Sequence, residues 1–314
     1  MQVITTDEAV IGWNDGNLPA MHKMTWNSSN EFIGAIYYRI YNVIAVSNEF
    51  IKNTSDGSLA ANGITGDNAT EAKYMRAEAR FLRAQSYYHA LDLFGNVPFV
   101  DENTPAGELP KRITRAELFT WVESELLAVA NDLKDPKTNE YGRADKAAAW
   151  TLLARLYLNA KVYTGTERNN DVITYTNKVI SSGYSLKSKY SDLFLADNNL
   201  NNPEVILSIN YDGLKSQTYG GTTFLVHAAV GGSMAPADFG IGGGWGGLRV
   251  TKTFVNKFTD ANDKRGNFYT QGQSLEINDL GDFKNGYAFI KYKNMTSAGV
   301  KGSDESGTFV DADI

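Results

Sequence analysis

Residues 69–98, which read ATEAKYMRAEARFLRAQSYYHALDLFGNVP, decide the fold. They predict a long helix over 69–94. Asn68 and Glu71 have the spacing of a capping box at its start, and Gly95 is typical of a helix end. Apolar side chains lie on more than one face of this helix, so we expect it to pack between other helices. The two predicted stripes are Met75, Ala79, Leu82 and Leu93, and Phe81, Ala84, Tyr88 and Leu91.

Further helices are predicted on both sides of this one. Thr114 and Glu117 repeat the capping signal and begin a helix that ends before Pro136. Helices joined by turns, with small residues where they would cross, are typical of stacked helix-turn-helix repeats. The spacing is irregular, so the sequence predicts a mainly α fold in which helix pairs form a repeat-like α-solenoid. The other predicted helices span 31–52, 145–162, about 172–183 and a short stretch at 190–194.

The character of the sequence changes at about residue 197. Short strands are predicted at 204–211 and 287–292, between glycine-rich loops. The first thirty residues are also expected to be loop, with Trp26 in the core. We therefore expect a single domain over 1–314, in which 1–196 is mainly helical and 197–314 is loop-rich with short strands.

Composition narrows the classes of function. The net charge of −6 gives no long-range attraction for nucleic acid or anionic lipid. The absence of cysteine excludes disulfides, thiolate metal sites and cysteine nucleophiles. No apolar run approaches the ~18 residues of a membrane span, and the opening residues do not resemble a secretory leader. Aromatic residues are abundant, with 17 Tyr, 15 Phe and 5 Trp, and such side chains suit flat ligand contacts.

Several segments are similar to hallmarks of the RagB/SusD family. The first is AEARFLRA at 77–84, continued by LDLFGNVP at 91–98. The second is GRADKAAAW, which begins at position 142, followed by ARLYLNA from position 154. Residues 190–197 and 219–226 also resemble the starch-binding founder member of the family. The resemblance covers nearly the whole chain.

The resemblance implies a lipid-anchored protein of the bacterial outer membrane, exposed at the cell surface. Tetratricopeptide-like helices would form the scaffold, and loops would form a glycan site. Such a protein would act as a lid on a TonB-dependent SusC-like transporter and deliver oligosaccharides to it. The family's lipidated N-terminus and its C-terminal helices are expected to lie outside these 314 residues.

The resemblance also implies a ligand site built on aromatic side chains. In the founder member, the matching segment carries two tryptophans two positions apart and then an asparagine. Trp13 matches the second tryptophan and Asn17 the asparagine, while Ile11 replaces the first tryptophan. Tyr219 matches a tyrosine of the same aromatic arc, and Trp245 lies in a glycine-rich loop like one that bears a further contact. As an alternative, Trp13 fills a neighbouring core and Tyr219 is only a turn residue.

Sugars present a face of C–H bonds and a rim of hydroxyl groups, which aromatic rings and planar polar groups bind. We therefore expect a binding protein and no enzyme, with starch-type α-glucans as the ligand. Another polysaccharide or a peptide is the alternative ligand, because Ile11 alters the arc. Two alternatives come from other classes of protein. One is a glycoside hydrolase, since 36 acidic residues offer many carboxylate pairs. The other is a structural helical adaptor.

Two further motifs concern metals and cofactors. Asp197 and Asn199 lie in an asparagine-rich turn that resembles a metal-binding turn of the family, so a structural calcium ion is an alternative to a plain turn. No other cofactor is expected. Gly242, Gly244 and Gly247 satisfy G-x-G-x-x-G, but no buried strand precedes them. A dinucleotide site is therefore not predicted.

Overall fold

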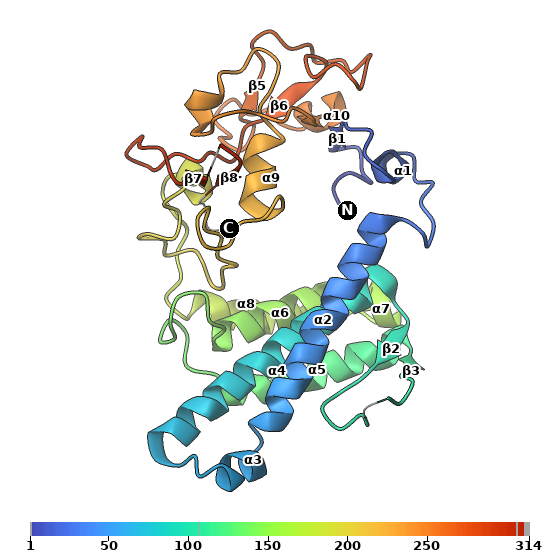
Figure 1. Ribbon diagram of the computed structural model, residues 1–314, viewed down its shortest axis with the longest axis vertical. Coiled ribbons are helices and arrows are strands. Elements are labelled where there is room, and N and C mark those ends of the chain that lie inside the picture. The colour runs from blue at the N-terminus through green and yellow to red at the C-terminus, as the bar shows by residue number, and fades with distance from the viewer. Residues whose placement is uncertain (1, 106, 306, 311–314) are drawn as a thin grey trace. The chain divides into compact units, whose positions relative to one another are not determined.

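The computed structural model describes residues 2–105, 107–305 and 307–310. The chain divides into two compact units, and Figure 1 labels most of their helices and strands. Unit 1 comprises Met1–Gly34 and Leu186–Ile314, and unit 2 comprises Ala35–Ser185. The chain that forms unit 2 is therefore inserted between the two stretches that form unit 1.

Unit 2 is built mainly from helices (Figure 1). These helices, of which the first begins in unit 1, are α2 (Glu31–Asn53), α3 (Asp56–Ala61), α4 (Gly66–Phe94), α5 (Arg115–Asp132), α6 (Lys146–Leu158), α7 (Ala160–Thr164) and α8 (Asn169–Ile180). α4 packs against α5, α5 against α6, and α6 against α8. Helices close in sequence are thus neighbours in space, which confirms the predicted mainly α fold. Unit 2 also contains a two-stranded sheet of β2 (Val97–Phe99) and β3 (Lys111–Ile113).

The predicted capping box at the start of α5 is present. The Thr114 hydroxyl accepts a hydrogen bond from the Glu117 amide at 3.3 Å, and the Glu117 carboxylate accepts one from the Thr114 amide at 3.0 Å. The capping box predicted at Asn68 and Glu71 is wrong. α4 begins earlier, at Gly66, which places both residues inside the helix, where the backbone amides bond to preceding carbonyls.

α4 supplies part of the core of unit 2. The predicted stripe that includes Phe81 and Leu91 is buried. In the other stripe, Met75 and Leu82 are 40% and 43% exposed, so this face of α4 is only partly covered. The helix ends at Gly95 as predicted, where a φ of 74° favours glycine because it has no Cβ.

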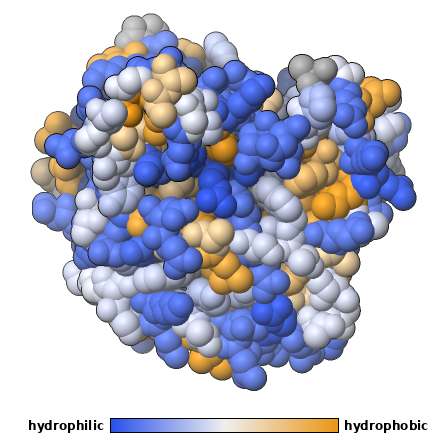
Figure 2. Space-filling model, turned by 90° about the horizontal axis from the view of Figure 1, so that it is seen from below, coloured by the Kyte–Doolittle hydropathy of each residue, from blue (hydrophilic) through white to orange (hydrophobic). Residues whose placement is uncertain are grey.

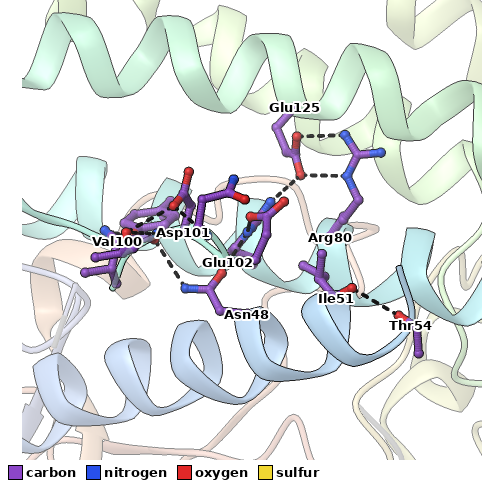
Figure 3. A network of polar contacts seen from close by, with 12 residues as sticks. Asn48, Ile51, Thr54, Arg80, Val100, Asp101, Glu102 and Glu125 are labelled. Atoms are coloured by element: carbon purple, nitrogen blue, oxygen red, sulfur yellow. Dashed lines mark hydrogen bonds and ion pairs between the residues drawn. The ribbon is translucent and has the colours of Figure 1, made fainter. Parts of the chain in front are cut away.

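Arg80 of α4 belongs to a network of polar contacts within unit 2 (Figure 3), and Arg83 of the same helix shares its partner Glu125. Arg80 binds both carboxylate oxygens of Glu125 in α5, each at 2.9 Å, and Arg83 binds the same carboxylate at 2.9 Å. Arg83 also donates to Glu102 at 2.5 Å and to Asn48 of α2 at 2.7 Å. The arginines of the family-like motif therefore join α2, α4 and α5, because each guanidinium has donors for several partners.

Unit 1 contains a four-stranded antiparallel sheet with the order β1-β4-β6-β5. The strands are β1 (Ala9–Ile11), β4 (Leu248–Val250), β5 (Phe268–Tyr269) and β6 (Tyr287–Phe289). β1 pairs with β4 along its whole length, so the start of the chain joins a sheet made from its last third. The remaining elements are α1 (Leu18–His22), η1 (Tyr190–Phe194), α9 (Gly221–His227), η2 (Pro236–Phe239), α10 (Lys252–Val255), β7 (Asp304–Glu305) and β8 (Phe309–Val310).

Several local predictions for unit 1 are wrong. Residues 204–211 form no strand, because a suitable composition gives a strand only where a neighbouring edge is available. The strand predicted at 287–292 ends at Phe289. The first thirty residues contain β1 and α1 in addition to loop, and Trp26 is 40% exposed instead of lying in the core.

Exposed hydrophobic residues occur singly or in small groups on the face drawn in Figure 2, with hydrophilic residues between them. Such scattered apolar residues are normal for a folded protein. Among the residues that the structure describes, no helix has both the length and the apolar character needed to cross a bilayer.

Candidate functional site

Three of the four predicted ligand residues lie side by side in unit 1. The ring centroids of Trp13 and Trp245 are 6.2 Å apart, and those of Trp245 and Tyr219 are also 6.2 Å apart. Phe309 follows at 5.2 Å from Tyr219. We call these four side chains the aromatic row. Neighbouring rings are inclined to each other by 54°, 49° and 50°, so the row is not flat.

Trp13 is positioned by the glycine-rich loop before β4. It follows β1 by two residues, and its indole Nε1 donates a hydrogen bond to the Gly246 carbonyl at 2.5 Å. A Cβ on Gly247 would lie 2.3 Å from the same nitrogen. Glycine is therefore required at 247 for the indole to reach its place, because any side chain there would overlap the ring.

Trp245 rests on the end of α9. Its ring stacks on the imidazole of His227 at 4.8 Å and 29°, and its backbone amide donates to the His227 carbonyl at 2.8 Å. The His227 side chain is fully buried, with its ring nitrogens at 3.0 Å from the Thr223 carbonyl and 3.2 Å from the Gly307 carbonyl. A buried, hydrogen-bonded imidazole is a rigid support for the Trp245 ring, and Trp245 as a whole is half-buried.

Tyr219 is the most open ring of the aromatic row, with 69% of its surface exposed. It lies just before α9, which begins at Gly221 with a φ of +57°. A Cβ at 221 would lie 2.1 Å from the Tyr211 ring, so glycine permits both the tight turn and this close contact. The exposed face of Tyr219 is available for contact with a ligand.

Asn17, the fourth predicted residue, is the N-cap of α1, four residues after Trp13. Its backbone is anchored, since its carbonyl accepts from the Asn30 side chain at 3.1 Å and its amide donates to Glu31 at 3.4 Å. Its own amide group makes no capping bond and is exposed. An exposed amide on a fixed backbone can present both a donor and an acceptor to a hydroxyl group.

Trp13 also contributes to the core of unit 1. The indole packs edge-on against Phe224, with centroids 5.9 Å apart, and borders a buried cluster that includes Ile11 and Leu248. It also lines a largely apolar cavity of about 740 Å³. Ile11 is only 3% exposed, so its side chain belongs to the core and does not interrupt the surface of the row.

Phe309 is the member of the aromatic row that sequence reasoning missed. Its position depends on contacts between distant parts of the chain, since the Val310 amide donates to the Thr223 hydroxyl at 3.3 Å. No local pattern around Phe309 signals this contact. Only a resemblance that extended to this segment could have pointed to it.

In the turn predicted to bind calcium, the Asp197 carboxylate is hydrogen-bonded to Ser297. Both oxygens of Asp197 accept hydrogen bonds from Ser297, from its amide at 2.9 Å and from its hydroxyl at 2.6 Å. Asn199 is exposed. Over the described residues, no group of three or more histidine, aspartate or glutamate side chains could hold a metal. Ca²⁺ also takes asparagine and backbone carbonyl oxygens, and calcium binding at this turn stays a prediction.

Comparison with known proteins by sequence finds relatives of one kind. Residues 3–158 match a family model described as starch-binding and associating with the outer membrane. The starch-binding protein SusD of Bacteroides thetaiotaomicron is 37% identical over 259 residues, which cover 81% of this chain and 44% of SusD. The SusD-like protein P2 of Formosa agariphila is 24% identical over 313 residues, which cover 94% of this chain and 59% of that protein. The chain spans about half the length of these curated relatives.

Comparison of the structure gives the same kind of neighbour. Surface glycan-binding protein A from Bacteroides thetaiotaomicron, solved in complex with laminarihexaose, matches with a TM-score of 0.72 at 20% identity, covering 99% of this chain and 68% of that one. A SusD superfamily protein from Parabacteroides distasonis matches with a TM-score of 0.74 at 21% identity, covering 99% and 65%. At this identity the likeness concerns the fold.

Proposed function

We propose that this chain, which belongs to the SusD-like family, is a glycan-binding protein. We further propose that the aromatic row of unit 1 binds the glycan. The family assignment confirms the resemblance found in the sequence. The single observation that carries the proposal for the site is the open ring of Tyr219 beside Trp245. An aromatic surface of this kind, held in place by the buried His227 side chain, can pack against the C–H face of a sugar.

Starch-type α-glucan is the ligand that we propose. Successive rings of the row are inclined by about 50°, which suits a chain that curves from one sugar to the next better than a flat β-1,4 chain. The relative with 37% identity is named for starch binding. Another polysaccharide is the second candidate, because a structural neighbour was solved with laminarihexaose.

We further propose that the protein binds its glycan without cleaving it. The starch-binding protein SusD and surface glycan-binding protein A, both similar to this chain, are named for binding. We also propose that the protein is lipid-anchored at the cell surface and delivers the glycan to a SusC-like TonB-dependent transporter. Support for both comes from the family resemblance and from the description of the matched family model as associating with the outer membrane.

Affinity electrophoresis in gels that contain starch, levan, xylan or mannan tests the ligand. We expect retardation by starch, with release by cyclodextrins, which arrive already curved and lose less freedom on binding. Retardation only by a β-linked or fructose polymer would contradict the α-glucan assignment and leave glycan binding standing.

Analysis of products after long incubation with starch tests the absence of catalysis. We expect no oligosaccharide release. Release that disappears in an acid-to-amide variant would contradict the binding-only role, because glycoside hydrolysis depends on a pair of carboxyl groups.

A further inference from the structure

A second groove in unit 1 has a chemical character different from that of the aromatic row. Its volume is about 660 Å³, and it shares no lining residue with the row. We call it the basic groove. The lining residues that matter for its chemistry are Lys189, Tyr190, Phe194, Lys264, Arg265 and Lys291.

Backbone hydrogen bonds fix the walls of the basic groove. One wall is η1, which is joined to the segment after β6 because the Lys293 amide donates to the Phe194 carbonyl at 3.1 Å. The other wall is the turn at 260–266. This turn is closed by the Asp263 amide, which donates to the Asp260 carbonyl at 3.0 Å, and by the Gly266 amide, which donates to the Asp263 carbonyl at 3.2 Å. Each wall is therefore held by backbone hydrogen bonds of the protein itself.

The groove carries an excess of positive charge. Lys189 forms an ion pair with Asp192 at 2.9 Å, and Arg265 forms one with Asp263 at 2.7 Å. Across the part of the chain that the structure describes, neither Lys264 nor Lys291 has a carboxylate within ion-pair distance. Two cations thus stay uncompensated at one place in a chain whose net charge is −6.

Aromatic rings hold the ammonium group of Lys291 in place of a carboxylate. Its Nζ lies 4.0 Å from the centroid of Phe194 and 5.7 Å from that of Tyr190. These two rings meet edge to face at 5.0 Å. A cation–π contact orients the ammonium without neutralising it, so the charge remains available to an anion.

We propose that the basic groove binds a sugar unit that carries a carboxylate or a sulfate. The ring of Tyr190 would contact the C–H face of the sugar, while Phe194 holds Lys291 and the ammonium groups of Lys264 and Lys291 bind the anionic substituent. A local excess of two charges suits a single anionic substituent. It does not suit a polyanion such as nucleic acid, which the net negative charge of the chain repels.

Titration calorimetry on the whole chain tests the basic groove with four probes. They are an α-1,4-linked galacturonate hexamer, a sulfated disaccharide derived from heparin, neutral maltohexaose and a ten-nucleotide oligothymidylate. We expect the galacturonate, the sulfated disaccharide or both to bind more weakly as salt increases. The first two probes distinguish a carboxylate from a sulfate. Binding of neither, or binding of oligothymidylate alone, overturns the proposal.

The Lys264→Gln/Lys291→Gln double variant is the decisive comparison. It should lower affinity for the anionic saccharide about tenfold or more, because two charge-assisted contacts are lost. The control variant Lys23→Gln/Lys215→Gln removes the same charge from two exposed lysines of unit 1 outside the groove, and it should have less than about a twofold effect. Equal losses in the two double variants would overturn the proposal, since the effect would then come from net charge alone.

Two single variants separate this result from folding and from the glucan site. Lys264 is exposed, so Lys264→Gln should keep the unfolding temperature and still weaken binding of the anionic saccharide. Tyr219→Ala should weaken maltohexaose binding and leave the anionic saccharide unaffected. If Tyr219→Ala also abolishes binding of the anionic saccharide, both ligands use the aromatic row, and the basic groove is not a separate site.

Discussion

Replacing Tyr219 with alanine should separate ligand binding from folding. The side chain is 69% exposed, so its loss removes little core contact. We expect the free energy of unfolding to change by less than ~0.5 kcal/mol. Loss of an aromatic platform from a binding site costs ~1–3 kcal/mol of binding energy. The dissociation constant for maltohexaose should therefore rise about 5- to 150-fold.

The same change at Trp13 should affect both binding and folding. Its half-buried indole packs against Phe224 at 5.9 Å and donates a hydrogen bond to the Gly246 carbonyl. Complete loss of a buried tryptophan side chain costs ~3–5 kcal/mol of stability, so a half-buried ring should cost ~2 kcal/mol. We expect Trp13→Ala to lose at least as much affinity as Tyr219→Ala and, in addition, to unfold at a lower temperature.

Titration calorimetry with maltohexaose and α-cyclodextrin measures affinity, and scanning calorimetry measures unfolding. Tyr38→Ala is the matched control, because Tyr38 is 74% exposed on α2 in unit 2 and should change neither quantity. Unchanged affinity in a normally folded Tyr219→Ala protein would refute the reasoning. So would a loss of stability in Tyr219→Ala as large as that in Trp13→Ala, because the exposed ring would then belong to the core.

Gly247→Ala should weaken maltohexaose binding about fivefold or more and shift the tryptophan fluorescence emission. The reason is that a Cβ at 247 would lie 2.3 Å from the Trp13 Nε1 atom and displace the ring. An unchanged emission spectrum would contradict this. Thr114→Ala should lower the free energy of unfolding of unit 2 by ~1 kcal/mol in urea titrations, since the capping box is lost, and an unchanged midpoint would argue that the cap contributes nothing. Burial alone would raise the pKa of the Glu125 carboxyl, but hydrogen bonds and charge from two arginines hold that pKa below its usual value. A carboxyl with a lowered folded pKa adds stability that is present above its unfolded pKa of about 4.3 and is lost as pH falls through the folded value. Unit 2 should therefore unfold more readily below about pH 4, and Glu125→Gln should flatten that pH dependence while lowering stability at pH 7. Circular dichroism in urea at pH 3 to 7 measures both effects, and the same pH profile in the variant would exclude Glu125 as its source.

Two features that depend only on neighbouring residues were predicted correctly from the sequence, whereas the capping box predicted at Asn68 and Glu71 was not. The capping box of Thr114 and Glu117 needs only residues three positions apart, and the helix end at Gly95 needs only one backbone conformation. No local sequence pattern predicted the strand β1. Its three residues form a strand because β4 offers an edge, and that edge comes from the last third of the chain. Residues 204–211 show the converse, since their composition suits a strand but they form none.

The residues of the candidate site were predicted only through resemblance to a family. No periodicity connects Trp13 with Tyr219 or Trp245, because they come together through the packing of β1, α9 and the loop before β4. Ile11 was expected to alter the binding surface, and its side chain is buried in the core of unit 1. Its effect on the choice of ligand stays a prediction. Phe309 joins the row through a long-range contact that local sequence cannot reveal.

The insertion of unit 2 within the chain of unit 1 gives the two units different folding requirements. The hydrogen bond from Trp13 to Gly246 spans 233 positions. Contacts of such long range must close a large loop, and the entropy cost of closure grows with loop length. The helices of unit 2 contact near neighbours in sequence, so their pairings can form early. The sheet of unit 1 requires β1 to meet β4 across the whole of unit 2, so we expect it to form later.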